Sequence, residues 1–554
     1  VTAHSRTGGS GPGSLGTVYL CPAGQTPRLR VDSHGTAVGV WTPLLPGAAG
    51  VVSVGDLTVA GAGVVVAPFE GAPIRAESIA VLRGANLTHP VPSAAATFSL
   101  TAQVAGTLFV DAESRIDASS RGCPGTTTLG VRTVGAAKSG AGGSHGGAGY
   151  GNSSNSLYGQ PENPRYPGSG GAPRASNGGS GGGLVRLHAG VAVIDGAVLA
   201  NGGHGSYYWA MTGGSGGGVL INVGDWSGTG VVEAKGGNGN WGDYGGNGGS
   251  GGGGRIAVHV GGNQGVDVPS LSAAGGTGGS GRGGDGTVVL NTAPSFFWAD
   301  PRPGVFGDAA LLGWELLAAP ADTTVTLYAA AAGAAEVLLA GGLPAVGSHT
   351  WNTTALPSGV YRVRAVYGDG AHAVTGEASR DVLIRHGAAL HGGMLTADET
   401  WSAGVLHLVA DDITIPADVT LTLAAGALVK VAAGRTLRVL PGGAVVSAGT
   451  AETPAVVTSL RDDACGGDDN GDGGTTSPAP GDWGGVVVDA GTALPGAASL
   501  RLLYGTREQA GEAAASTTWE AENLHRVRDD VTVSAGKSLT IAAGAMVRFD
   551  RTRA

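Results

Sequence analysis

The stretch Gly178-Gly179-Ser180-Gly181-Gly182-Gly183 decides the fold, because the same hexapeptide begins again at Gly213 and at Gly248. The spacing of about 35 residues is typical of repeats that stack into solenoids. Each copy is followed by an apolar run, then by a second strand-like run and a tag of small residues, a pattern of strands between turns. The apolar runs are Leu184-Val185-Arg186-Leu187, Val219-Leu220-Ile221 and Arg255-Ile256-Ala257-Val258. The sequence therefore predicts a parallel β-solenoid with glycine-rich excursions.

The glycine-rich excursions have two interpretations. They could be flexible loops, which would cost much conformational entropy to order. Alternatively, tracts such as Gly245–Gly251 could pack side by side as extended helices with three residues per turn, because only glycine allows such close axes. The recurrence of the tracts in register favours the ordered alternative.

A longer period is present as well. Gly16-Thr17-Val18-Tyr19-Leu20 follows a Gly-Gly-Ser-Gly run, and so does Gly286-Thr287-Val288-Val289-Leu290. We therefore expect the first residues to be the end of an earlier block, and the chain to be a piece of a longer repetitive protein.

The carboxyl-terminal part repeats in another style. Residues 400–431 align without gaps on residues 518–549, with apolar and polar residues alternating between glycine turns as in half-buried strands. Stacked repeats of this kind share one core. We expect a second parallel β-helix over residues 387–554.

A segment without either repeat lies between them. It contains the strand-like runs Thr324–Tyr328, Ser348–Trp351 and Gly359–Ala365, which suggest a small β-sandwich. The predicted organisation is therefore all-β: a glycine-rich solenoid over residues 1–293, a sandwich over 294–386 and the second β-helix over 387–554.

Composition excludes several classes of protein. Of 554 residues, 106 are glycine against an average usage of about 7%, and charged residues make up only 13%. A disordered chain would be less hydrophobic and more charged. The net charge of −10 argues against a nucleic-acid partner. Cys21, Cys123 and Cys465 are too few and too scattered for a disulfide framework or a zinc site, and no apolar run is long enough to span a membrane.

Two resemblances point to an extracellular protein. The run Gly143-Ser144-His145-Gly146-Gly147, with the glycine-rich residues 168–171, resembles glycine-rich repeats of large bacterial surface proteins. The stretch from Leu421 to Gly485 is similar to right-handed parallel β-helix repeats of extracellular bacterial proteins. Gly359–Val363 resembles a late strand of immunoglobulin-like and fibronectin-like modules. The first two resemblances imply secretion and a solenoid, and they imply no reaction.

The best chemical motif is an acidic run around Asp468. Alternate oxygen-bearing residues before a glycine turn suit Ca²⁺, which takes six to eight oxygen ligands. The bidentate Glu of the helix-loop-helix version is missing, since Ala479 stands there, so nearby acids would complete the site. The alternative is a solvated acidic insertion between repeats. The predicted metal ligands are Asp468, Asn470 and Asp472, before the turn at Gly473, with Asp463 and Asp482, or Asp462, supplying further oxygens.

Aromatic residues gather in the excursions. Exposed rings brought to one side by neighbouring repeats would form a platform for stacking sugars, whereas buried rings would pack on one another. The residues concerned are Tyr207, Tyr208, Trp209, Trp241 and Tyr244.

Catalysis is not expected. Acidic and histidine residues recur at matching positions of the repeat, whereas a catalytic pair would occur once. The doublets Asp411-Asp412 and Asp529-Asp530 therefore indicate architectural turns. His407 and His525 are likewise paired by the repeat. His145 lies in a glycine turn, where a structural hydrogen bond is expected. No nucleophile or phosphate-loop signature is present.

The sequence thus predicts a structural or adhesive segment of a large extracellular or cell-surface protein. Its partners would be further copies or neighbouring repeats of the same protein, or surface glycans. The alternative is a carbohydrate-binding or carbohydrate-cleaving β-helix module.

Overall fold

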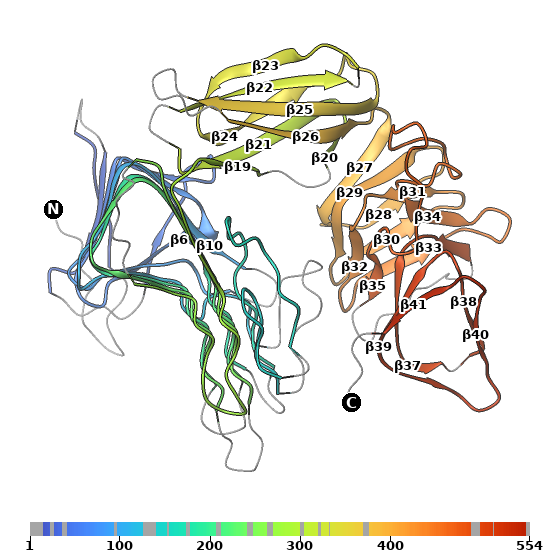
Figure 1. Ribbon diagram of the computed structural model, residues 1–554, viewed down its shortest axis with the longest axis horizontal. Helices are drawn as coiled ribbons and strands as arrows, with labels where there is room; N and C mark the ends of the chain where they lie inside the picture. Colours follow the sequence, from blue (N-terminus) through green and yellow to red (C-terminus); the bar gives the residue numbers. More distant parts are fainter. Residues whose placement is uncertain are drawn as a thin grey trace. The chain divides into compact units, whose positions relative to one another are not determined.

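In the structure, a computed structural model, the regular secondary structure is almost entirely β-strand (Figure 1). Strands account for 49% and helix for 1%, and most of the sheets are parallel, which confirms the prediction of an all-β chain. The structure describes residues 15–22, 27–35, 41–92, 97–125, 140–151, 154–172, 178–205, 212–240, 248–262, 270–299, 304–319, 323–331, 333–368, 376–488, 499–513 and 515–549.

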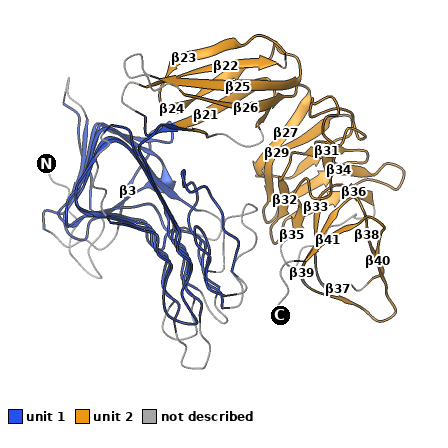
Figure 2. Ribbon diagram, viewed as in Figure 1, with its two compact units in different colours: residues 1–295, 316–322 blue, residues 296–315, 323–554 orange. Residues whose placement is uncertain are grey.

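The chain forms two compact units (Figure 2): residues 1–295 with 316–322, and residues 296–315 with 323–554. In the first unit, an eleven-stranded sheet is parallel except where its first two strands pair. Its strands are β1 (Val18–Leu20), β2 (Arg28–Asp32), β4 (Val52–Ser53), β5 (Asp56–Ala60), β7 (Ile74–Ala76), β8 (Ser78–Leu82), β10 (Ser99–Val110), β12 (Leu184–Ile194), β14 (Gly218–Ser227), β16 (Arg255–Val260) and β18 (Thr287–Asn291).

A second, parallel sheet of seven strands alternates with the first along the chain. Its strands are β3 (Thr42–Leu44), β6 (Val65–Pro68), β9 (Asn86–Leu87), β11 (Arg115–Asp117), β13 (Ala197–Leu199), β15 (Val231–Glu233) and β17 (Ser270–Ser272), and the single-turn 3₁₀ helix η1 (Phe69–Gly71) follows β6. Each glycine-rich hexapeptide leads directly into a strand of the first sheet, as the spacing predicts.

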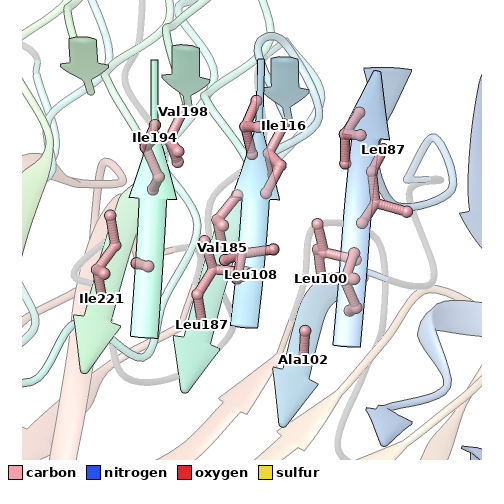
Figure 3. Close-up of a cluster of buried hydrophobic side chains, with 14 of the residues drawn as sticks. Leu87, Leu100, Ala102, Leu108, Ile116, Val185, Leu187, Ile194, Val198 and Ile221 are labelled. Atoms are coloured by element: carbon pink, nitrogen blue, oxygen red, sulfur yellow. The ribbon is translucent and has the colours of Figure 1, made fainter. Parts of the chain in front are cut away.

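Strands of the first unit pair in register from one repeat to the next. Val185 lies opposite Val219, and Val219 opposite Ile256, and all three side chains are fully buried. Figure 3 shows the apolar side chains of both sheets gathered in one shared core. Alternation of apolar and polar residues in each repeat therefore builds one continuous row of core side chains.

The described parts of the glycine tracts are ordered and hydrogen-bonded to one another. Gly179 and Gly182 donate their N–H groups to the carbonyls of Thr212 and Ser215. The next tract repeats the pattern, since Gly213 and Gly216 donate to Gly249 and Gly252. A bond to the same neighbour at every third residue is the geometry of an extended helix with three residues per turn. The hydrogen bonds thus support the ordered alternative over flexible loops.

The hydrogen-bonded glycine tracts form what we call the glycine bundle. Glycine is required inside this bundle because backbone atoms fill the space that a side chain would need. A Cβ atom added to Gly182 would lie 1.9 Å from the carbonyl oxygen of Ala200, and one added to Gly253 would lie 1.8 Å from that of Ala273. Both contacts are far inside van der Waals distance, and the blocking atoms belong to backbone that is itself held in the stack.

Alanine substitution should therefore destabilise the protein at glycines inside the bundle and not at exposed glycines. We expect Gly182→Ala and Gly253→Ala each to lower the free energy of unfolding of the first unit by at least about 2 kcal/mol through overpacking. The matched control is Gly47→Ala, because the nearest atom to a Cβ at Gly47 is 3.8 Å away. Denaturant unfolding followed by circular dichroism measures the difference, and equal stability of all three variants would contradict the close packing.

Along the chain, the parallel sheets of the first unit are followed by a three-stranded and a five-stranded sheet, which we call the antiparallel segment. Phe296 stacks on Tyr367, and Trp351 meets Tyr361 edge-on, both pairs at 5.7 Å, so the faces of these sheets contact each other. The strands are β19 (Ser295–Trp298), β21 (Ala309–Leu317) and β24 (Val346–Asn352), and β20 (Gly304–Phe306), β26 (Gly376–Ile384), β25 (Gly359–Gly368), β22 (Thr324–Ala331) and β23 (Val337–Leu343). The pairs β21–β24, β22–β23, β22–β25 and β25–β26 are antiparallel, and β20 pairs with β26 in parallel.

The carboxyl-terminal strands pair only in parallel. They are β27 (Ala388–Met394), β28 (Glu399–Trp401), β29 (Leu406–Ile415), β30 (Thr420–Leu423), β31 (Leu428–Val431), β32 (Thr436–Val439), β33 (Ala444–Ser447), β34 (Ala455–Ser459), β35 (Gly485–Val488), β36 (Leu500–Leu502), β37 (Thr506–Ala513), β38 (Thr517–Trp519), β39 (Leu524–Val533), β40 (Leu539–Ile541) and β41 (Met546–Phe549). The first copy of the sequence repeat includes β28–β31 and the second includes β38–β41.

The two repeated histidines make structural contacts, as their matching positions in the repeat predict. His407 stacks on Trp401 at 5.3 Å, and His525 stacks on Trp519 at 5.2 Å. Each ring also bonds through Nε2 to a backbone carbonyl five residues earlier.

The first aspartate doublet requires a correction. Asp411-Asp412 was expected in a turn, but it lies inside the continuous strand β29, where the strand changes its partner from β31 to β32. Arg435 Nη1 lies 2.9 Å from Asp411 Oδ1, and the N–H of Thr436 donates to Asp412 Oδ1. These two carboxylates therefore make contacts at the point where β29 changes its parallel partner from β31 to β32.

Candidate metal centre

The predicted metal ligands lie in the acidic loop, residues 461–484, which connects β34 to β35. Oxygen atoms of Asp463, Asp468 and Asp472 lie within 4.8 Å of one another. The loop turns at Gly473, whose φ of 67° is in the left-handed region that favours glycine. The structure therefore brings three of the five predicted ligands together around the predicted glycine turn.

Hydrogen bonds inside the loop fix two of these carboxylates. Asp468 accepts the N–H groups of Asp472 and Gly473. Asp472 accepts hydrogen bonds from the hydroxyl and from the N–H of Thr476. Both bonds lower the pKa of Asp472, and the bond from the hydroxyl has the larger effect. Donated bonds hold a carboxylate in its charged form.

The pKa of Asp463 is shifted in the opposite direction. Desolvation raises the pKa of Asp463, and the negative charges of Asp468 and Asp472 raise it further. Its Oδ1 atom has no hydrogen-bond partner among the described residues. Three close carboxylates repel one another, and a bound cation would remove that repulsion.

The other two predicted ligands differ in their placement. Asn470 lies within the turn, where its Nδ2 donates to Asp472 Oδ2 at 2.9 Å and its Oδ1 accepts the N–H of Asp472 at 3.4 Å, so this amide oxygen lies near the cluster. Asp482 lies apart from the cluster: it accepts bonds from Ser459 and from the N–H of Ala479, and pairs with Arg461. Asp462 is also occupied, because the hydroxyl of Thr458 donates to it. The loop thus offers three carboxylates and an amide oxygen, fewer protein oxygens than the six to eight that Ca²⁺ takes, so water would supply the rest.

A buried ion triad, absent from the sequence-based prediction, anchors this loop. The side chain of Lys430 on β31 is fully buried, and its Nζ lies 2.7 Å from Asp469 Oδ2 and donates to the carbonyl of Gly467 at 2.6 Å. Asp469 is only 3% exposed, and its other oxygen accepts a bond from Arg385, directly after β26. The triad therefore ties the acidic loop to a parallel strand and to the end of the antiparallel segment.

One sequence signal could have indicated the triad. Lys430 is one of only four lysines in the chain, and it lies in a strand of otherwise apolar residues. A lone ammonium at such a position requires a buried carboxylate partner, because an unpaired buried charge costs several kcal/mol. Which of the acids of the loop would supply the partner was not readable from spacing.

The predicted glycan platform cannot be placed. Its members, Tyr207, Tyr208, Trp209, Trp241 and Tyr244, lie outside the residues that the structure describes. His145, by contrast, is described: it is fully buried, and its Nδ1 lies 3.0 Å from the carbonyl oxygen of Gly216, in keeping with a structural hydrogen bond.

Comparisons of the chain with protein-family models, curated proteins and solved structures found no match. Within the described residues, no helix has the length and apolar character needed to cross a membrane.

Proposed function

We propose that this chain is a rigid structural segment of a large, repetitive extracellular or cell-surface protein, built from two parallel β-solenoids joined by a small immunoglobulin-like or fibronectin-like sandwich. The observation that carries the proposal is the hydrogen-bonded glycine bundle on the in-register stack of the first unit. Stacked repeats share one core, and three-residue-per-turn helices bond to their neighbours along their whole length. Such a body keeps its shape under load and presents a long, constant surface.

An adhesive or self-assembling role follows from that geometry. A solenoid offers the same surface at every repeat, so weak contacts to further copies or to surface glycans add up through multivalency.

The rigid-segment proposal is tested by amide hydrogen exchange together with a binding assay. We expect the N–H groups of residues 179–182 and 213–216 to be protected as strongly as those of β12 and β14, since their exchange requires opening of the bundle. Beads coated with the protein should cluster with one another or adhere to glycan-coated surfaces, and uncoated beads should do neither. Rapid exchange of the glycine amides, or a compact monomer that binds no surface, would overturn the proposal.

We further propose that the acidic loop binds Ca²⁺ as a structural ion. The three clustered carboxylates, the raised pKa of Asp463 and the unpartnered Asp463 Oδ1 support this role. An ion bound to the folded state alone stabilises it by about 2.7 kcal/mol when its concentration is a hundred times its Kd.

Calorimetry should show the calcium effect. We expect Ca²⁺ to raise the Tm of the second unit and Mg²⁺ to raise it less, because Mg²⁺ demands stricter octahedral geometry. Asp468→Asn combined with Asp472→Asn should abolish the rise, and Glu452→Gln, an exposed acid outside the cluster, should preserve it. An unchanged rise in the double variant would place the ion elsewhere.

A further inference from the structure

A cavity with a volume of about 300 Å³ lies between β35 and β37 in the second unit. Just before these two strands begin, the chain segments pair once, because Trp483 forms a parallel bridge with Gly505 and accepts the N–H of Thr506. Beyond that point, within the described residues, β35 and β37 are the outermost strands of two separate sheets. The cavity therefore opens where a parallel ladder stops, and the backbone groups of two strand edges border it.

The second copy of the carboxyl-terminal repeat supplies one side of this cavity, and the first copy shows what the same positions hold elsewhere. The correspondence includes the strands that begin each copy, because β27 pairs with β29 in the register in which β37 pairs with β39, with the same register shift. Cavity-lining positions change from apolar to polar between the copies: Thr506, Arg507, Glu508 and Asn523 stand where the first copy has Ala388, Ala389, Leu390 and Val405. Stacking of the repeat does not require these polar side chains, since the first copy stacks without them.

Arg507 brings a donor without a partner to the cavity. Its Nε–H is buried and has no hydrogen-bond partner among the described residues. Its Nη2 lies 3.4 Å from the carbonyl oxygen of Leu502 and 3.9 Å from Glu520 Oε2. Leaving a buried N–H without an acceptor costs stability, and an acceptor on a bound ligand would remove that cost.

The β35 side of the cavity is apolar. Val486, Val488 and Leu502 line it, and all three are half-buried side chains that pack on the core of the carboxyl-terminal sheets. The charges on the other side oppose each other, because the guanidinium of Arg507 lies near two carboxylates, Glu508 in the lining and Glu520 beside it. A ligand that fits this cavity has an apolar face, a polar edge and no net charge.

We propose that the cavity binds one neutral pyranose ring of a glycan. The C–H groups of the ring contact the valines of β35. Neighbouring hydroxyl groups, which both donate and accept, bond to the carboxylate of Glu508 and the guanidinium of Arg507. The volume lies at the small end of the range of ligand sites and suits a single ring. The inference rests on the proposed adhesion to surface glycans and gives it a site.

The test is saturation-transfer NMR of the full chain with the methyl glycosides of glucose, galactose and mannose, each at millimolar concentration. We expect transfer to at least one of them. Arg507→Ala combined with Glu508→Leu restores the residues of the first copy, so the double variant should fold. It should weaken binding at least about tenfold, because hydrogen bonds to charged groups are lost.

A second variant and a matched control complete the experiment. Gln509→His also restores the residue of the first copy, where His391 bonds to His407 as Gln509 bonds to His525. It removes a lining amide and should weaken binding too. The control Lys537→Ala removes one positive charge from an exposed position between β39 and β40, and it should leave binding unchanged.

Three results would overturn the proposal. They are no transfer to any of the three glycosides, equal transfer in the double variant and the unmodified protein, and stronger binding of glucuronate than of the glucoside, which would assign the cavity to an anion. None of them would alter the protection of the glycine amides or the clustering of coated beads with one another, so the rigid-segment proposal fails or stands separately.

Discussion

Acidification from pH 7 to pH 4 is expected to lower the free energy of unfolding of the first unit by about 6 kcal/mol, through two buried histidines. His89 and His145 are fully buried, and burial lowers the pKa of each to about 4. The nearby cations Arg121 and Arg255 lower these pKa values as well. Each histidine has a pKa near 6.5 in the unfolded chain, so each contributes about 3 kcal/mol.

The direction follows from proton binding. Between about pH 6.5 and pH 4 the unfolded chain binds a proton at each of these histidines and the folded chain does not, so stability falls as the pH falls through that window. Denaturant unfolding of the full chain at pH 7, 5.5 and 4, with circular dichroism as the probe, measures the slope. The single variants His89→Gln and His145→Gln should each reduce proton uptake on unfolding by about one. His349→Gln, on β24 of the second unit, should leave the proton uptake of the first unit unchanged. A pH-independent stability of the first unit would show that these imidazoles are hydrated in solution.

Replacing Asp469 by alanine should destabilise the second unit by about 3–5 kcal/mol, because Lys430 would remain buried without its counter-charge. The fully buried ammonium would keep only the carbonyl of Gly467 as a partner, and Arg385 would lose its bond as well. Calorimetry of the full chain measures the loss.

A double-mutant cycle separates the pair from its surroundings. Lys430→Met combined with Asp469→Ala should cost less than Asp469→Ala alone, because no unpaired buried ammonium remains. The control Asp381→Ala removes the carboxylate of an exposed pair with Arg362, and it should change stability little. Additive effects of the two buried substitutions would mean that the charges are stabilised by solvent and not by each other.

Much of the fold was readable because repetition and alternation act locally. The apolar runs after each glycine hexapeptide became β12, β14 and β16, and the constant spacing placed them in register. The strand-like runs of the middle segment became β22, β24 and β25. In these places the period of two and the glycine boundaries are sufficient, since the side chains of one repeat meet their counterparts in the next.

The candidate site was less readable because its geometry depends on residues distant in sequence. The clustering of Asp463 with Asp468 and Asp472 follows from a local turn and was anticipated, whereas the bonds that Asp482 accepts from Ser459 and Ala479 were not. The pairing of Asp469 with both Lys430 and Arg385 joins three separate elements. Ion pairs between distant elements produce no repeating pattern in the sequence. Spacing alone therefore could not identify Asp469, among its acidic neighbours, as the partner of Lys430 and Arg385.

The glycine bundle also bears on resistance to proteolysis. Proteases select their substrates by side chains held in specificity pockets, and they bind the scissile segment as an added extended strand. In the bundle, glycines such as Gly182 and Gly216 carry no side chain, and their N–H groups are already bonded to Ser215 and Gly252. Cleavage therefore requires a tract to leave the bundle first, so the segments that resemble flexible linkers in composition are, by their packing, poor substrates for digestion.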